Sequence, residues 1–108
     1  MTVREFIDKH GLTPVVLPEP DREVSGCYIG DLLSWVMGRA KSDNVWLTIM
    51  TNINTVAVAS LTDVSLVLLT EGVALPPEVE AAAGAKGVNV ASTALPTFEA
   101  AMRVGCDL

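Results

Sequence analysis

Between Val45 and Arg103 the chain repeats one pattern three times: a short apolar run, a polar turn and a helix-like stretch. The apolar runs cover 45–50, 64–69 and 88–91, and polar residues follow them at 51–52, 70–72 and 92–93. Continuous apolar strands that alternate with helices are typical of a parallel sheet covered on both faces. The pattern therefore predicts an α/β fold: a single three-layer domain with a mostly parallel sheet of about four to five strands and helices on both faces.

The N-terminal part of the chain predicts one helix and two further strands. Thr2 is a suitable N-cap for a helix over 3–10. Strands are expected over 12–17 and over 22–29. Pro14 places the first of them at an edge of the sheet, because proline cannot donate a hydrogen bond to a neighbouring strand.

Two of the later helices carry apolar side chains on one side. Asp31 suits the N-cap of the helix that follows it, because its carboxylate can accept the unpaired backbone N–H groups of the first turn. That helix carries a broad apolar face formed by Leu32, Val36 and Ala40 and flanked by Leu33, Trp35 and Met37. The last helix of the chain is expected to place Phe98, Ala101 and Met102 inward.

Composition limits the classes of protein to consider. A length of 108 residues, half of them hydrophobic, predicts one domain over 1–108. The net charge is −6, with 13 acidic and 7 scattered basic residues, which argues against a nucleic-acid partner. No apolar stretch reaches the roughly 18 residues of a transmembrane helix, and the N-terminus is unlike a signal peptide. We therefore expect a cytoplasmic protein with no membrane contact.

The chain has too few metal-binding side chains in any local motif to predict a metal site. Cys27 and Cys106 lie far apart in the sequence, and His10 is the only histidine. We expect Cys27 to be a small core residue and Cys106 a terminal thiol. The sequence predicts no metal and no cofactor.

The polar turns that follow the apolar runs are the candidate ligand-binding site, because ligands of parallel sheets sit beyond the carboxyl ends of the strands. The candidate residues are Thr51, Asn52, Asn54, Thr70, Glu71, Gly72 and Thr93. Two simpler interpretations stay open. Asn52 or Asn54 could only cap the following helix, and residues 70–72 could form a plain turn at the end of a strand.

Catalysis finds little support in the sequence. The chain has no G-x-S-x-G motif, no P-loop and no G-x-G-x-x-G motif. No candidate nucleophile lies at a sequence spacing from a candidate base that matches a known catalytic motif. We therefore predict that the protein is not an enzyme.

Residues 26–104 resemble the DRTGG domain family, and within it the small stand-alone bacterial type. The resemblance is carried by residues 26–37, 48–61, 67–72, 90–93 and 97–99. It implies an α/β domain similar to the N-terminal domain of HPr kinase/phosphorylase, with residues 1–25 as an N-terminal helix and strand extension. Family members accompany CBS-domain pyrophosphatases, where the domain is regulatory and forms dimers.

The chain departs from the family pattern at two turns. Where larger relatives have an Asp-Arg pair, it has Asn52-Ile53, and where they have Thr-Gly-Gly, it has Thr70-Glu71-Gly72. Ile53 cannot contact a phosphate, and Glu71 adds a negative charge near the expected pocket. Thr70 and Gly72 match the family motif.

Together these features predict a non-catalytic regulatory module. We expect a homodimer that senses a small ligand, such as a nucleotide, and signals to a partner protein. Two alternatives stay open. One is a pure protein–protein interaction adaptor, which the resemblance to the stand-alone family type places in a redox or hydrogenase-associated signalling system, and the other is a hydrolase acting on a nucleotide.

Overall fold

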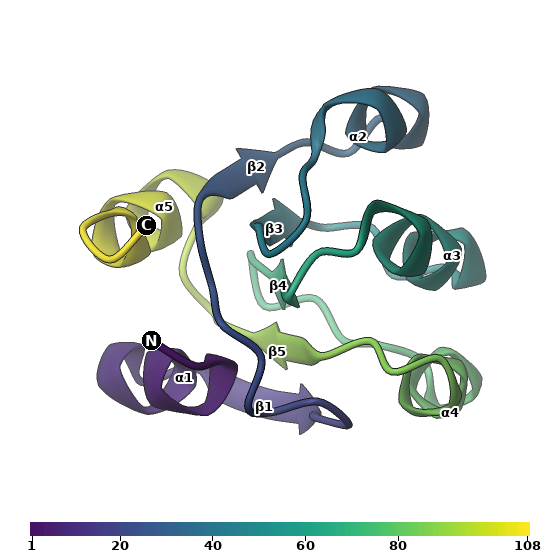
Figure 1. The fold of residues 1–108 in the computed structure, drawn as a ribbon, viewed down its shortest axis with the longest axis horizontal. Helices are drawn as coiled ribbons and strands as arrows, with labels where there is room; N and C mark the ends of the chain where they lie inside the picture. The colour runs from purple at the N-terminus through teal and green to yellow at the C-terminus, as the bar shows by residue number, and fades with distance from the viewer.

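The helices and strands follow the repeat expected from the sequence. In the computed structural model, which describes all 108 residues, the elements are α1 (Val3–His10), β1 (Thr13–Val16), β2 (Cys27–Ile29), α2 (Leu33–Arg39), β3 (Val45–Thr48), α3 (Ile53–Thr62), β4 (Leu66–Leu69), α4 (Pro77–Ala85), β5 (Val90–Ser92) and α5 (Thr97–Gly105) (Figure 1). Helix α1 has the expected bounds, and a capping box between Thr2 and Glu5 fixes its start. The longest helix, α3, has 10 residues, and no helix is long and apolar enough to cross a lipid bilayer.

The five strands form one sheet in the order β1-β5-β4-β3-β2. Strands β2 to β5 are parallel, and only β1 runs antiparallel, beside β5. Pro14 lies in β1, at the edge of the sheet as predicted. Leu69 pairs with Thr48 on one side and with Ser92 on the other, so the carboxyl ends of β3, β4 and β5 lie level. The predicted α/β class with a mostly parallel sheet is confirmed.

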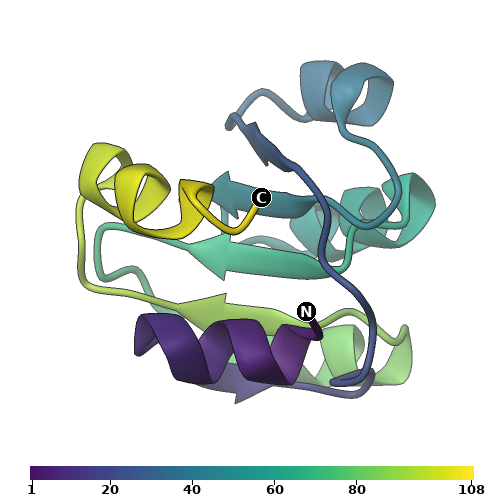
Figure 2. The same cartoon turned by 60° about the vertical axis from the view of Figure 1, so that its left-hand side comes forward.

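The connections between the parallel strands all run in one direction across the sheet, from β2 to β5. Because such crossovers are right-handed, α2, α3 and α4 must all lie on the same face. Figures 1 and 2 show these three helices on one face and the two terminal helices, α1 and α5, on the other. The result is the predicted three-layer arrangement.

Alternation along the buried strands divides the core between the two faces. Val45 and Leu47 of β3 pack with Phe6 on the face covered by α1 and α5. Trp46 points to the opposite face, where it packs in the cluster that includes Val56 of α3. All four residues of β3 and all four of β4 are buried, as expected for strands covered on both faces.

The strand expected over 22–29 is shorter than predicted, because β2 covers only its last three residues. Arg22, in the segment before β2, is held by two distant side chains. Its guanidinium donates to Asp63 Oδ1 and to Asp43 Oδ1, both at 2.9 Å, and this segment is not part of the strand. Gly26 then adopts a left-handed conformation with φ of 77°, which ends the irregular segment before β2. The sequence pattern could not reveal these side-chain contacts between distant segments.

The expected inward face of α5 is wrong, whereas the broad apolar face expected on α2 is present but largely exposed. In α5 the buried residues are Ala100 and Val104, whereas Phe98 and Met102 are 70% and 66% exposed. Two residues along a helix correspond to about 200° around its axis, so the larger apolar pair lies opposite the buried one. Only Val36 of α2 is buried.

The two cysteines are both exposed, so the expectation that Cys27 is a core residue is also wrong. Cys27 opens the edge strand β2, next to only one other strand. Contact with the protein around its thiol nevertheless raises the pKa of Cys27 to about 11. The Cys27 thiol therefore stays protonated at neutral pH, which lowers its reactivity.

Candidate functional site

The parallel sheet brings the predicted site residues to one edge, the end of the sheet at which the parallel strands have their carboxyl ends. Residues 51–54 follow β3, residues 70–72 follow β4 and Thr93 follows β5, and these three strands are neighbours that point the same way. The order of the strands could not be predicted from their hydrophobic patterns. Ligand binding by these residues stays a prediction, and their detailed contacts decide how each could take part.

The turns after β4 and β5 are joined by hydrogen bonds. The Glu71 backbone N–H donates to the Leu95 carbonyl at 2.9 Å, and that of Gly72 donates to the Thr93 carbonyl at 3.1 Å. The Thr70 and Thr97 hydroxyl oxygens lie 2.7 Å apart. The chain leaves β4 toward α4 on one face and leaves β5 toward α5 on the other (Figure 1). Parallel sheets typically bind ligands where neighbouring connections diverge in this way, and here the chain's own contacts fill that position.

Glu71 occupies the N-terminus of α5 with its carboxylate. Its Oε2 accepts a hydrogen bond of 2.8 Å from the backbone N–H of Thr97, the first residue of the helix. Pro96, the N-cap, makes no side-chain capping bond, so Glu71 supplies the cap from a different element. The positive end of a helix attracts anions, including phosphate. The chain's own carboxylate therefore sits where the phosphate of a ligand would bind best.

We expect the Glu71→Ala substitution to lower the free energy of unfolding by about 1 kcal/mol, because it removes the cap of α5. Glu71 also has a left-handed φ of 63°, a conformation that costs a non-glycine residue roughly 1 kcal/mol. Glu71→Gly should therefore be the more stable of the two variants. Urea unfolding of both proteins measures the difference, and a Glu71→Gly variant less stable than Glu71→Ala would contradict this account.

The turn after β3 combines a helix cap with unengaged polar groups. Asn52 Oδ1 accepts a hydrogen bond of 2.9 Å from the Asn54 backbone N–H, so Asn52 caps α3. The Asn54 side chain is exposed and has no hydrogen-bond partner in the chain, and neither does the half-buried Thr51 hydroxyl. Thr55 is 2% exposed, and its hydroxyl is buried without a partner. No hydrogen bond joins this turn to the Thr70–Gly72 turn beyond the backbone pairing of the strands.

Asp31 does not cap α2, contrary to the expectation from the sequence. The N-cap is Leu32, and it makes no side-chain capping bond. Asp31 Oδ1 instead accepts hydrogen bonds from the Thr48 hydroxyl at 2.7 Å and from the Ile49 backbone N–H at 3.0 Å. Asp31 thus fastens the turn after β2 to the turn after β3, a contact that no local spacing could indicate.

Five large apolar side chains are exposed on the segments beside this edge, on the side of β2 and β3, and are called the apolar patch. It consists of the residues Ile29, Leu32, Trp35, Ile49 and Ile53, each between 44% and 60% exposed. These residues come from the end of β2, the start of α2, the turn after β3 and the start of α3. The Arg39 guanidinium stacks over the Trp35 ring at 4.1 Å from its centroid. Exposed apolar patches of this kind typically mark interaction sites.

A hollow of about 360 Å³ lies at the opposite end of the sheet, near the amino ends of β4 and β5. Its walls consist of Glu19, Arg22, Ala59, Ser60, Asp63, Val64, Lys86, Gly87 and Val88. The predicted site therefore does not coincide with this hollow. Its polar walls come from three segments that are distant in the sequence, which is why sequence analysis did not find it.

The carboxylate of Asp63 should make the protein less stable in acid. A hydrogen bond from Ser42 and the nearby Arg22 guanidinium hold the pKa of Asp63 below its usual value of 3.8. Its contribution to stability is therefore fully present above pH 3.8 and is lost as the pH falls through the lowered pKa. We expect Asp63→Asn to reduce the unfolding free energy at pH 7, and the gap to the natural protein to narrow below about pH 4. A gap that is constant between pH 7 and pH 2 would contradict this assignment.

Comparison with known proteins gives a match in fold. No protein-family model matches the chain, and no curated protein matches its sequence. A similar structure is that of the CBS and DRTGG domains of the regulatory region of Clostridium perfringens pyrophosphatase, complexed with the activator diadenosine tetraphosphate. The TM-score is 0.72 at 14% sequence identity, over 92% of this chain and 44% of the other, so the chain spans less than half of that structure. The chain therefore has a fold similar to that of part of this CBS and DRTGG regulatory region, in agreement with the predicted resemblance to the DRTGG family.

Proposed function

We propose that this protein is a non-catalytic regulatory module that binds a small phosphate-bearing ligand, of the nucleotide class, at the carboxyl edge of its sheet. We further propose that it forms a homodimer through the apolar patch beside that edge. The observation that carries the proposal is that the polar turns of three adjacent parallel strands and this apolar patch share one edge.

The contacts of the edge favour a ligand with both a phosphate and a hydrogen-bonding base. Asn54 and Thr51 have unengaged polar groups, and the N-terminus of α5 suits an anion. A phosphate bound there must replace the carboxylate of Glu71. The neighbour in fold is complexed with diadenosine tetraphosphate, which makes a nucleotide the first ligand to test.

Thermal-shift measurements with a panel of nucleotides that includes diadenosine tetraphosphate test the ligand. A ligand at 100 times its dissociation constant stabilises the folded state by about 2.7 kcal/mol. Asn54→Ala should reduce this shift, whereas Lys86→Gln, at the hollow on the opposite edge, should leave it unchanged. The reverse result would put the ligand in the hollow and reject the proposed site.

The patch favours a second copy of the chain as its partner. Strand β2 is an unpaired edge of the sheet, and large apolar side chains surround its end. Burying such side chains contributes roughly 25 cal/mol for each Å² of apolar surface. Because the patch adjoins the polar turns, a ligand that prefers one dimer arrangement would shift the population of dimers.

Sedimentation of two matched variants tests the dimer. Trp35→Glu should dissociate it, because a charge would be buried in the interface without a partner. Phe98→Glu is the control: Phe98 is also exposed and aromatic, but it lies on α5 on the other face of the sheet. A natural protein that is monomeric, or dissociation by Phe98→Glu alone, would reject this interface.

A second candidate function is a protein–protein adaptor without a small ligand. It is favoured by the structural engagement of Asn52, Thr70 and Glu71, which leaves few groups at the edge for a ligand. The absence of a thermal shift with every nucleotide, together with a partner protein whose binding Trp35→Glu abolishes, would favour the adaptor. A nucleotide hydrolase would instead show turnover that Glu71→Gln abolishes.

A further inference from the structure

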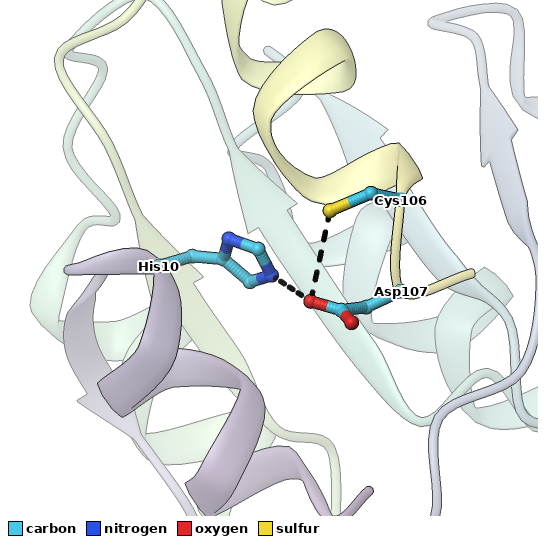
Figure 3. Close-up of side chains that lie close together, drawn as sticks. All are labelled: His10, Cys106 and Asp107. Atoms are coloured by element: carbon cyan, nitrogen blue, oxygen red, sulfur yellow. Dashed lines mark hydrogen bonds and ion pairs between the residues drawn. The ribbon is translucent and has the colours of Figure 1, made fainter.

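Helices α1 and α5 meet at their C-terminal ends and bring together three side chains of the kinds that ligate metal ions (Figure 3). His10 is the last residue of α1, Cys106 is the C-cap of α5 and Asp107 follows it. His10 Nε2, Cys106 Sγ and a carboxylate oxygen of Asp107 all lie within 4.8 Å of one another. We propose that these three residues form a binding site for a thiophilic divalent cation of the zinc class.

The distances require only a small rearrangement. His10 Nε2 lies 2.7 Å from Asp107 Oδ2, and Cys106 Sγ lies 3.9 Å from the same oxygen. A tetrahedral zinc ion, with bonds of about 2.0–2.3 Å, holds its ligand atoms roughly 3.3–3.6 Å apart. The histidine and aspartate must therefore separate by less than about 1 Å, and Cys106 Sγ must move closer by roughly 1 Å, since the ligand atoms span up to 4.8 Å. Cys106 is exposed and Asp107 half-buried, so rotation of these two side chains can provide the change.

The surroundings of the cluster favour a cation. Carbonyl groups at the ends of two helices give this region a partial negative charge. A thiolate, a carboxylate and a neutral imidazole would together balance the charge of a divalent ion. Two cations nearby oppose the ion: Lys9 Nζ pairs with Asp107 Oδ1, at 2.9 Å, and the Arg103 guanidinium reaches the His10 carbonyl, at 3.5 Å. The other carboxylate oxygen, Oδ2, faces His10 and Cys106 and is the one left for the metal.

Metal binding at this site is an exchange of protons for the ion, without oxidation or reduction. The Cys106 thiol releases its proton to water as the Sγ–metal bond forms. His10 must be neutral with its proton on Nδ1, so that the Nε2 lone pair faces the ion. A proton on Nε2 in its hydrogen bond with Asp107 Oδ2 must first leave that nitrogen, to Nδ1 of a neutral ring or to water from a charged one. Binding should therefore weaken as the pH falls.

The simpler interpretation is that His10 and Asp107 only tie the two helices together by an ion pair. Such a pair needs no cysteine. The contribution of Cys106 is therefore the property that separates a metal site from a structural contact, and the chain offers a matched control in its other cysteine, Cys27.

Titration of the purified chain with Co²⁺, a spectroscopic substitute for zinc, tests the proposal. The natural protein should show thiolate-to-cobalt charge-transfer absorption that saturates at one ion per chain and is displaced by Zn²⁺. Cys106→Ser should abolish the band and weaken Zn²⁺ binding by at least about 100-fold, more than loss of an outer-shell partner typically costs. Cys27→Ser should leave both unchanged. Cys106 is exposed, so its replacement should not prevent folding.

Several results would overturn the site. They are the absence of a charge-transfer band in the natural protein, retention of the band in Cys106→Ser, or its loss in Cys27→Ser. Alkylation gives a second measurement: Zn²⁺ should protect Cys106 from iodoacetamide, and an unchanged rate of modification would count against the site.

Discussion

Replacing Trp46 with alanine is expected to lower the free energy of unfolding by about 3–5 kcal/mol, the usual cost of deleting a large aromatic side chain from a core. Trp46 is fully buried between β3 and the helices of one face. Its indole Nε1 donates a hydrogen bond of 2.9 Å to the Gly30 carbonyl, so the substitution also leaves that carbonyl unpaired. Domains of ordinary stability have only about 5–15 kcal/mol, so this one change should remove a large part of the total.

The chain contains a natural control for this experiment, because it has two tryptophans. Trp35 is 54% exposed, and Trp35→Ala should change the unfolding free energy by no more than about 0.5 kcal/mol in dilute protein. Urea unfolding followed by circular dichroism measures both variants. Equal losses at the two positions would mean that the core lies elsewhere than between β3 and α2 to α4.

The fold could be predicted from the sequence where the pattern is local and long enough to repeat. The three apolar runs gave β3, β4 and β5 because strands buried on both faces need no polar positions. Helix α1 could be predicted to the residue because its start is set by a capping box and its end by Gly11 in a left-handed conformation.

Predictions failed where a larger apolar side chain was taken for a buried one. Phe98 and Met102 were expected to face the sheet, but α5 lies on it through Ala100 and Val104. The apolar face predicted for α2 is present, but only Val36 of it is buried, and Leu32 and Trp35 remain at the surface as part of the patch. A hydrophobic pattern shows on which side of a helix the apolar side chains lie. It does not show whether the same chain or a partner covers that side.

The candidate site could be predicted to the edge of the sheet but not to its contacts. The carboxyl ends of β3, β4 and β5 lie level, so the polar turns share one edge. The role of Glu71 depends on Thr97, 26 residues later, and the cluster of His10 with Asp107 joins residues 97 positions apart. Such pairs form only when helix ends meet in three dimensions, so no spacing in the sequence could indicate them.

Replacing Asn89 with leucine should lower the free energy of unfolding by about 3 kcal/mol, because three backbone groups lose their partner at a buried position. Asn89 is 1% exposed. Its Oδ1 accepts a hydrogen bond of 2.9 Å from the Glu19 N–H. Its Nδ2 donates to the Glu19 carbonyl at 2.7 Å and to the Ser65 carbonyl at 2.9 Å. Through these bonds Asn89 holds the segment before β2 against the starts of β4 and β5, where the hollow lies.

Aspartate at this position separates hydrogen bonding from shape. Asn89→Asp keeps the size of the side chain but turns two donated bonds into contacts between a carboxylate and two carbonyl oxygens. It should therefore destabilise the protein at pH 7 at least as much as leucine does, and less at low pH, where the protonated acid can again donate one bond. Asn54→Asp is the control, because the Asn54 side chain is exposed and has no partner, and it should change stability by no more than about 0.5 kcal/mol. If the two aspartate variants were equally stable in urea unfolding, Asn89 would not be the residue that fixes this segment to the sheet.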